Sequence, residues 1–148
     1  MVDVGGKDES DRHAVARGCV IMSEEALQQV IAGTIAKGNV QIVAELAGVM
    51  GAKRTSEIIP LCHPIALTHV DVQVEWDQDL PGAQIQATCS THAPTGVEME
   101  ALNAVAVAAL TVYDMVKAVD KKALISDIRL VEKRGGKSGD LFLEGGPA

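Results

Sequence analysis

The sequence predicts one α+β domain in which helices pack on one face of an antiparallel sheet. Its 148 residues are 47% apolar, which is enough for a single hydrophobic core and excludes wholesale disorder. Two segments, 70–76 and 84–90, alternate apolar and polar side chains with the period of two of a half-buried hairpin. A long apolar helix over 95–119 and a last strand at 124–133 follow the hairpin.

The elements before the hairpin are predicted from local signals. The first 18 residues are polar and contain glycine, and we expect them to form an extended amino-terminal arm. Ser23 can cap a first helix, because two acidic residues follow in the positive first turn. A second helix follows the break at 37–38 and carries large apolar side chains on one side. Residues 19–142 form the domain, and residues 143–148 form a flexible tail.

A short segment between the helices and the hairpin is stiffened by two prolines. Pro60 and Pro64 bracket Leu61, Cys62 and His63, so this tripeptide should be a rigid, extended corner. A lone histidine is more often structural, but a ring held in a fixed direction suits a catalytic or ligand-holding role. Cys62 should point away from His63, and no second Cys/His pair has ligand spacing, so we expect no metal site here.

The long helix is the most informative segment. Thr95 and Glu98 have the spacing of a capping box at its start. Five of its polar residues fall within about a third of the circumference; they are Glu100, Asn103, Thr111, Asp114 and Lys117. Asp114 and Lys117 are i, i+3 neighbours, and they form either a structural ion pair at an exposed helix end or an acid/base pair with coupled pKa values.

The length of this helix has a consequence for any site on it. Glu100 and Asp114 are separated by 14 residues, which is about 21 Å along a helix axis. One small ligand can hardly touch both in a single chain. We therefore expect a site shared between subunits, and a helix that is apolar on several sides also favours an oligomer.

The charge of the chain is uneven. The net charge is −7 and the aromatic content is 2%, which makes nucleic acids and anionic membranes poor partners. The segment Lys117–Lys137 nevertheless contains seven basic and only three acidic residues. This segment is either a focused site for a small anion or a solvated basic face.

The cysteines and the apolar segments bear on localisation. Three cysteines without a CxxC spacing, and no signal peptide at the start, predict a reduced, cytoplasmic protein. The longest apolar segment includes Asp114 and Lys117, so we do not expect a membrane span.

The segment KRGGKSGD is similar to a phosphate-binding loop in its glycines and lysines. It is not a Walker motif, because Val131 stands where that motif needs glycine and no helix follows. The loop could still close its basic residues Lys133, Arg134 and Lys137 over a phosphate. The alternative is a disordered basic linker.

Several strings of the sequence resemble one family. MVDVGGK, KGNV, AKRTSEIIPLCHP, TGVEMEAL, AALTVYDMVKAVDK and KRGGKSGD look like the MoaC family, the cyclic pyranopterin monophosphate synthases of molybdenum cofactor (molybdopterin) biosynthesis. The resemblance runs from residue 1 to about 142. Family members usually have a short segment before the residues that match MVDV, where this chain begins.

The resemblance implies a fold, an assembly and a reaction. The fold is a ferredoxin-like α+β sandwich, assembled as a homohexamer (a trimer of dimers) with its sites at dimer interfaces. The reaction is that of a phosphorus-oxygen lyase, which converts (8S)-3′,8-cyclo-7,8-dihydroguanosine 5′-triphosphate to cyclic pyranopterin monophosphate and pyrophosphate. No metal-ligand cluster is present in the motifs, although Mg²⁺ could accompany the triphosphate.

The resemblance also implies roles for individual residues. Asp114 and Lys117 match the catalytic positions. The substrate-contacting or pocket-lining positions match Leu61, Cys62, His63, Glu98, Met99, Glu100, Lys53, Lys37, Lys133 and Arg12. The same fold allows two other interpretations. One is a non-catalytic oligomeric module that binds a nucleotide or pterin, and the other is a purely structural oligomer. The Asp114–Lys117 pair favours the enzyme, since a binding module needs no acid/base pair.

Overall fold

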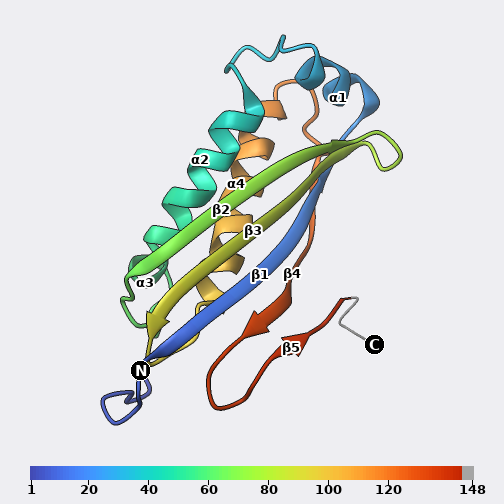
Figure 1. The fold of residues 1–148 in the computed structure, drawn as a ribbon. Helices are drawn as coiled ribbons and strands as arrows, with labels where there is room; N and C mark the ends of the chain where they lie inside the picture. The colour runs from blue at the N-terminus through green and yellow to red at the C-terminus, as the bar shows by residue number, and fades with distance from the viewer. Residues whose placement is uncertain (145–148) are drawn as a thin grey trace.

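The computed structural model describes residues 1–144 and shows an open sheet with helices α2 and α4 side by side on one face (Figure 1). Within these residues the strand order is β2-β3-β1-β4-β5, and all neighbouring strands are antiparallel. The elements are β1 Ser10–Ile21, α1 Glu24–Ile31, α2 Val40–Lys53, α3 Thr55–Ile58, β2 Leu67–Asp77, β3 Gly82–Ala93, α4 Glu98–Val116, β4 Leu124–Arg134 and β5 Leu141–Phe142. Strands β1 to β4 have the ferredoxin-like order, so the predicted fold class is confirmed.

The first strand occupies the centre of the sheet, whereas the sequence analysis placed residues 10–18 in the arm. β1 pairs with β3 on one side and β4 on the other. Ala14 and Ala16 in this strand are fully buried where β1 lies against α4. Small alanines let the helix approach the sheet, but they are poor strand formers, and this hid the strand from the sequence pattern.

The local signals for the first helix and the hairpin are confirmed. Ser23 caps α1, because its hydroxyl accepts a hydrogen bond from the backbone N–H of Ala26 at 3.2 Å. β2 and β3 pair with Val72 opposite Ala87, both buried. The predicted tail at 143–148 lies mostly outside the described residues. Its first part is held at β4, since the Leu143 N–H donates to the carbonyl of Val131.

The core lies between the sheet and α4. The fully buried side chains of this helix are Ala101, Ala104, Val105, Ala108, Ala109, Val112 and Val116. α2 packs closely beside α4, and the absence of a side chain at Gly51 permits this, since a Cβ there would lie 2.8 Å from Val107. Asn103 joins the two helices, since its Nδ2 donates to the Gly51 carbonyl at 2.8 Å and to Thr55 Oγ1 at 3.3 Å.

α4 is the one helix in residues 1–144 that is long and apolar enough to cross a membrane. The sequence did not predict such a segment, because Asp114 and Lys117 fall within the apolar run. In the structure 56% of the most apolar window of α4 is buried inside the fold. This burial is that of a core helix packed on a sheet.

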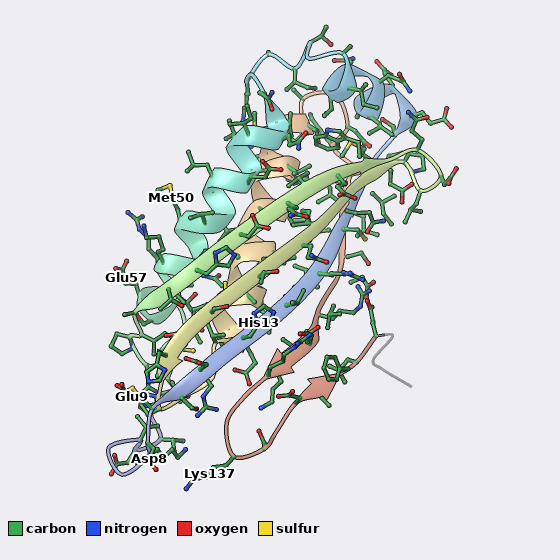
Figure 2. All side chains as sticks on the ribbon, viewed as in Figure 1. Asp8, Glu9, His13, Met50, Glu57 and Lys137 are labelled. Atoms are coloured by element: carbon green, nitrogen blue, oxygen red, sulfur yellow. The ribbon has the colours of Figure 1, made fainter. Side chains whose placement is uncertain are left out.

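α2 leaves large apolar side chains on its surface. Ile42, Leu46 and Met50 are 61%, 60% and 47% exposed, and Val43 beside them is also exposed. Figure 2 shows Met50 projecting outward from α2. These four residues, which we call the α2 apolar face, have no cover within the described chain.

Candidate active site

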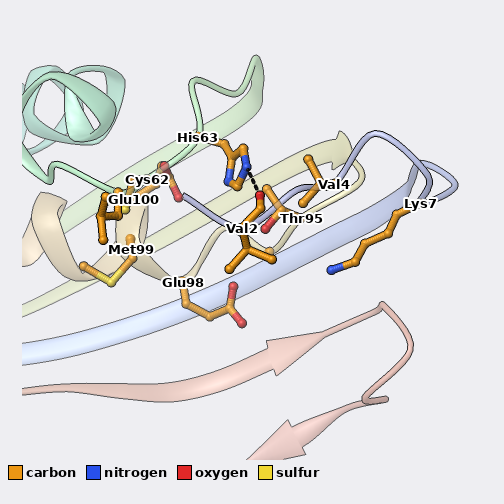
Figure 3. A pocket seen from close by; sticks show the side chains of 11 residues that line it. Val2, Val4, Lys7, Cys62, His63, Thr95, Glu98, Met99 and Glu100 are labelled. Atoms are coloured by element: carbon orange, nitrogen blue, oxygen red, sulfur yellow. Dashed lines mark hydrogen bonds between the residues drawn. The ribbon is translucent and has the colours of Figure 1, made fainter.

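A polar pocket lies where the arm, the proline-bounded corner and the start of α4 meet (Figure 3). Its volume is about 490 Å³, and its lining residues are Val2, Val4, Lys7, Leu61, Cys62, His63, Thr95, Gly96, Glu98, Met99 and Glu100. Six of the twelve residues predicted for the site therefore line one cavity. We call this cavity the corner pocket.

His63 is held by the arm. Its Nε2 lies 2.8 Å from the backbone carbonyl of Val2, which can only accept, so Nε2 carries the proton in this contact (Figure 3). The arm therefore closes one side of the corner pocket. The corner is not fully extended as predicted, because Pro60 and Leu61 form a turn that is closed by the Cys62 N–H donating to the Ile59 carbonyl at 3.2 Å.

The start of α4 differs from the prediction. The helix is capped at Val97 without a side-chain hydrogen bond, so the capping box of Thr95 and Glu98 is wrong. The chain enters the helix one residue before Glu98. Both side chains are left to line the corner pocket instead of satisfying backbone N–H groups.

Glu100 is a buried acid facing the corner pocket. It is 4% exposed, and its carboxylate has no ion-pair partner within residues 1–144. Burial, reinforced by the charge of Glu98, raises the pKa of Glu100. A buried carboxyl without a cation is suited to bind N–H donors of a ligand.

The thiol of Cys62 is a poor nucleophile. Burial and the charge of Glu100 raise its pKa, so the thiol stays protonated near neutral pH. Within the described residues no group of three or more His, Cys, Asp and Glu side chains is arranged to hold a metal ion.

A second hollow, rich in cations, adjoins the corner pocket. It has a volume of about 310 Å³ and is lined by Lys7, Arg12, Pro94, Thr95, Gly96, Glu98, Lys133, Lys137 and Ser138. Lys133 Nζ lies 3.5 Å from Glu98 Oε1 and donates to Ser138 Oγ at 2.7 Å. We call this hollow the cationic pocket. The two pockets share Lys7, Thr95, Gly96 and Glu98, so a ligand could extend from one into the other.

Some residues that line the two pockets were not predicted from the sequence. Lys7 lies in the string MVDVGGK, which supported the resemblance, but the analysis assigned it no role. Ser138 lies in the basic loop whose closure over a phosphate was one of two alternatives. Figure 2 shows Lys137 of this loop at the same end of the molecule as Asp8 of the arm, and both line one further cavity. Loop and arm come from opposite ends of the chain, so no local spacing relates them.

Three further predicted residues, Lys37, Asp114 and Lys117, form a separate group at the other end of α4. Lys117 Nζ lies 2.7 Å from Asp114 Oδ1, and Lys37 Nζ lies 2.5 Å from Asp114 Oδ2. The two ammonium groups, Lys117 first, lower the pKa of Asp114 to about 2, and Asp114 raises the pKa of Lys117. The Asp114 side chain is 53% exposed. We call these three residues the Asp114 cluster.

The structure brings the predicted residues together in two sets and does not join the sets within one chain. Glu98 and Glu100 begin α4, whereas Asp114 lies in its last turn. The separation of about 21 Å expected from helix geometry therefore applies. Lys53 ends α2 with an exposed side chain and does not line the corner pocket.

The fold and these groups define a class of protein. An α+β domain with a cationic pocket, a buried acid and an ionised carboxylate–lysine cluster has the groups of an enzyme that acts on a small anion. The model of the MoaC family matches residues 1–136. The chain belongs to the MoaC family.

Proteins with curated names are similar along nearly the whole chain. A cyclic pyranopterin monophosphate synthase of Dinoroseobacter shibae is 58% identical over 94% of this chain and 88% of its own length. The protein of the same name from Rhodospirillum rubrum is 59% identical over 94% and 84%, and that from Brucella ovis is 56% identical over 95% and 85%. These matches confirm the family, the function and the lyase class predicted from the sequence.

Proposed function

We propose that this chain is a cyclic pyranopterin monophosphate synthase whose active site combines the Asp114 cluster of one subunit with the corner and cationic pockets of another. The substrate is (8S)-3′,8-cyclo-7,8-dihydroguanosine 5′-triphosphate, and the products are cyclic pyranopterin monophosphate and pyrophosphate. The carrying observation is the Asp114 cluster, an ionised acid between two ammonium groups on an exposed helix end. The relatives that match 94% of this chain bear the name of this activity.

The Asp114 cluster supplies both halves of acid/base chemistry. The lowered pKa of Asp114 and the raised pKa of Lys117 mean that at neutral pH one is a carboxylate and the other an ammonium. Conversion of a purine-derived ring to a pterin needs several proton transfers, for which these groups serve as base and acid. His63 can relay protons at the corner pocket, because an imidazole ring can both donate and accept a proton.

The cationic pocket suits the triphosphate. A ribose-derived hydroxyl attacks the α-phosphorus, an oxygen–phosphorus bond forms, and the bond to the pyrophosphate leaving group breaks. Arg12 and Lys133 line the pocket and neutralise charge on the phosphates. Glu100, and Glu98 beside it, accept hydrogen bonds from the donor edge of the guanine-derived ring. Any Mg²⁺ enters as the counterion of the triphosphate, as part of the substrate.

A shared site needs an oligomer, and the α2 apolar face supports one. Exposed Ile42, Leu46 and Met50 on one helix are costly in water and are removed from it by a second copy of the chain. A homohexamer built from dimers is the assembly that we propose. We also propose a cytoplasmic location, with which the three unpaired cysteines agree.

The alternative is a non-catalytic module that binds a nucleotide or pterin. It predicts tight binding in the corner pocket, and it assigns no function to the Asp114 cluster. Two lysine side chains contact one acid in the Asp114 cluster. A module that only binds a ligand does not need such an acid/base arrangement, so the cluster favours the enzyme.

Pyrophosphate release from the cyclised nucleotide tests the activity. The wild-type chain should release it, and Asp114→Asn should lower the rate by roughly 10²–10⁴-fold, the range for loss of a general base. Full turnover by Asp114→Asn contradicts the catalytic role, and binding without any turnover by the wild type supports the binding module.

Subunit complementation tests the shared site. Co-expressed chains carrying Asp114→Asn and Glu100→Gln should recover activity, because one interface in the mixed oligomer has both functional ends. Co-expression of two differently tagged Asp114→Asn chains is the matched control and should recover none. No recovery in verified mixed oligomers contradicts a site between subunits.

A further inference from the structure

The loop between β4 and β5 lies directly against the side chain of Arg12. Gly136 has φ of +82°, in the region that favours glycine. A Cβ at this position would overlap Arg12 Nη1 and lie 2.7 Å from Arg12 Cζ. The guanidinium therefore occupies the space that a side chain on residue 136 would fill.

Arg12 is held there without hydrogen bonds to its inner nitrogen. Its Nε is buried and has no hydrogen-bond partner within residues 1–144. The side chain lines the cationic pocket with Lys133 and Lys137, and it also borders the neighbouring cavity that includes Gly136. Steric contact with the β4–β5 loop therefore helps to set the direction of the Arg12 guanidinium. The unpartnered Nε can still donate to a hydrogen-bond partner that the chain itself does not provide.

We propose that Gly136 is a positioning residue, whose missing side chain sets the place of the Arg12 guanidinium at which a phosphate group of the substrate or of pyrophosphate binds. This rests on the proposed function, since it takes the cationic pocket as the phosphate site. Arg12 makes the contact with phosphate. Gly136 acts only through Arg12, because it offers no side-chain donor of its own.

A second explanation for this glycine is backbone conformation alone. Gly139 in the same loop separates the two effects. Its φ is +69°, but a Cβ there would meet no atom within 4 Å. Alanine at residue 139 therefore brings backbone strain without a clash, whereas alanine at residue 136 brings both.

The experiment measures pyrophosphate binding by calorimetry in the intact protein, together with the thermal midpoint of each variant. Arg12→Ala and Gly136→Ala should each weaken binding by about tenfold or more, the scale of a hydrogen bond to a charged group. Gly139→Ala should bind within about twofold of wild type. If Gly136→Ala does not fold, Gly136→Asn replaces it, because asparagine tolerates positive φ but still carries a Cβ.

The double variant Arg12→Ala/Gly136→Ala makes the test specific. It should bind no more weakly than Arg12→Ala alone, because the glycine then has no guanidinium to position. Additive losses, or wild-type binding by Gly136→Ala while Arg12→Ala is weakened, overturn the positioning role and leave the phosphate site intact. Wild-type binding by Arg12→Ala overturns the phosphate site itself.

Discussion

Lys37 holds Asp114 at two points, since its Nζ donates to the carboxylate Oδ2 at 2.5 Å and to the backbone carbonyl at 2.9 Å. The first contact is an ion pair, and the second satisfies a carbonyl in the last turn of α4. Lys37 lies in the segment before α2, far from Asp114 in sequence. This contact fixes the direction of the acid before any substrate arrives.

Removing this lysine should raise the pKa of Asp114. In the wild type two ammonium groups lower it from 3.8 to about 2, and Lys37→Met leaves only Lys117. An acid with a lowered pKa stabilises the fold above 3.8, and this contribution is lost as pH falls towards 2. The variant should therefore lose less stability over that range.

A carboxyl NMR titration of Asp114 and acid unfolding curves check this prediction. Lys122→Met is the control, because it removes the same charge from the surface without touching Asp114. An unchanged Asp114 titration in Lys37→Met contradicts the role assigned to the contact.

Replacing the buried acid should make stability less sensitive to alkaline pH. Folding raises the pKa of Glu100 above its ordinary 4.5, so the folded state binds the proton more tightly and loses stability as pH rises above that value. Glu100→Gln should be more resistant to urea than wild type at pH 8 and nearly equal to it at pH 4. It should also lose activity, because the amide presents a donor to the ligand.

Urea unfolding at the two pH values measures this effect. Glu98→Gln serves as the comparison, since Glu98 is less buried and pairs with Lys133. A Glu100→Gln chain that is less stable than wild type at pH 8 would mean that the carboxylate has a stabilising partner in the assembled protein.

The polar residue between the two long helices should be structural. Asn103→Ala removes two hydrogen bonds and leaves the buried Gly51 carbonyl without this donor, which should cost about 1–3 kcal/mol of unfolding free energy. Thr111→Ala is the control, because its hydroxyl bonds only to a carbonyl of its own helix. Denaturant unfolding should show the larger loss for Asn103, and equal losses would contradict the interhelical role.

The α2 apolar face should control assembly. Leu46→Lys places a charge on a 60% exposed position, so the fold of one chain tolerates it while an interface does not. Sedimentation should show smaller particles and the assay should show lost activity. Gln28→Lys, on the exposed side of α1, should change neither. A Leu46→Lys chain that assembles like wild type would locate the interface elsewhere.

Sequence patterns predicted the elements that depend on local signals. The Ser23 cap, the hairpin and the strand at 124–133 (β4) are where periodicity and capping residues indicated, whereas the short strand β5 was not predicted. β1 was missed because the small side chains of Ala14 and Ala16 suit close packing against α4, whereas alanine has a low strand propensity. The capping box was wrong because two residues with suitable spacing line a pocket instead.

The contacts within the candidate site could be predicted from the sequence only in part. Helical spacing alone relates Asp114 to Lys117, and the structure confirms that they are in contact. Nothing local relates Lys37 to Asp114, or Lys7 to Ser138, because folding brings these pairs together from distant segments. The resemblance supplied Lys37 as a pocket residue, whereas its contact with Asp114 needed the fold.

The central position of β1 has a consequence for synthesis of the protein. β1 is synthesised before the strands that it contacts and pairs along both edges, with β3 and with β4, and β4 ends only at Arg134. Until that segment emerges, β1 has one open edge, and such edges are prone to pair with other chains. The sheet therefore closes only after residues 124–134 have emerged, and a nascent chain that stops before Leu124 should aggregate and not persist as a smaller folded unit.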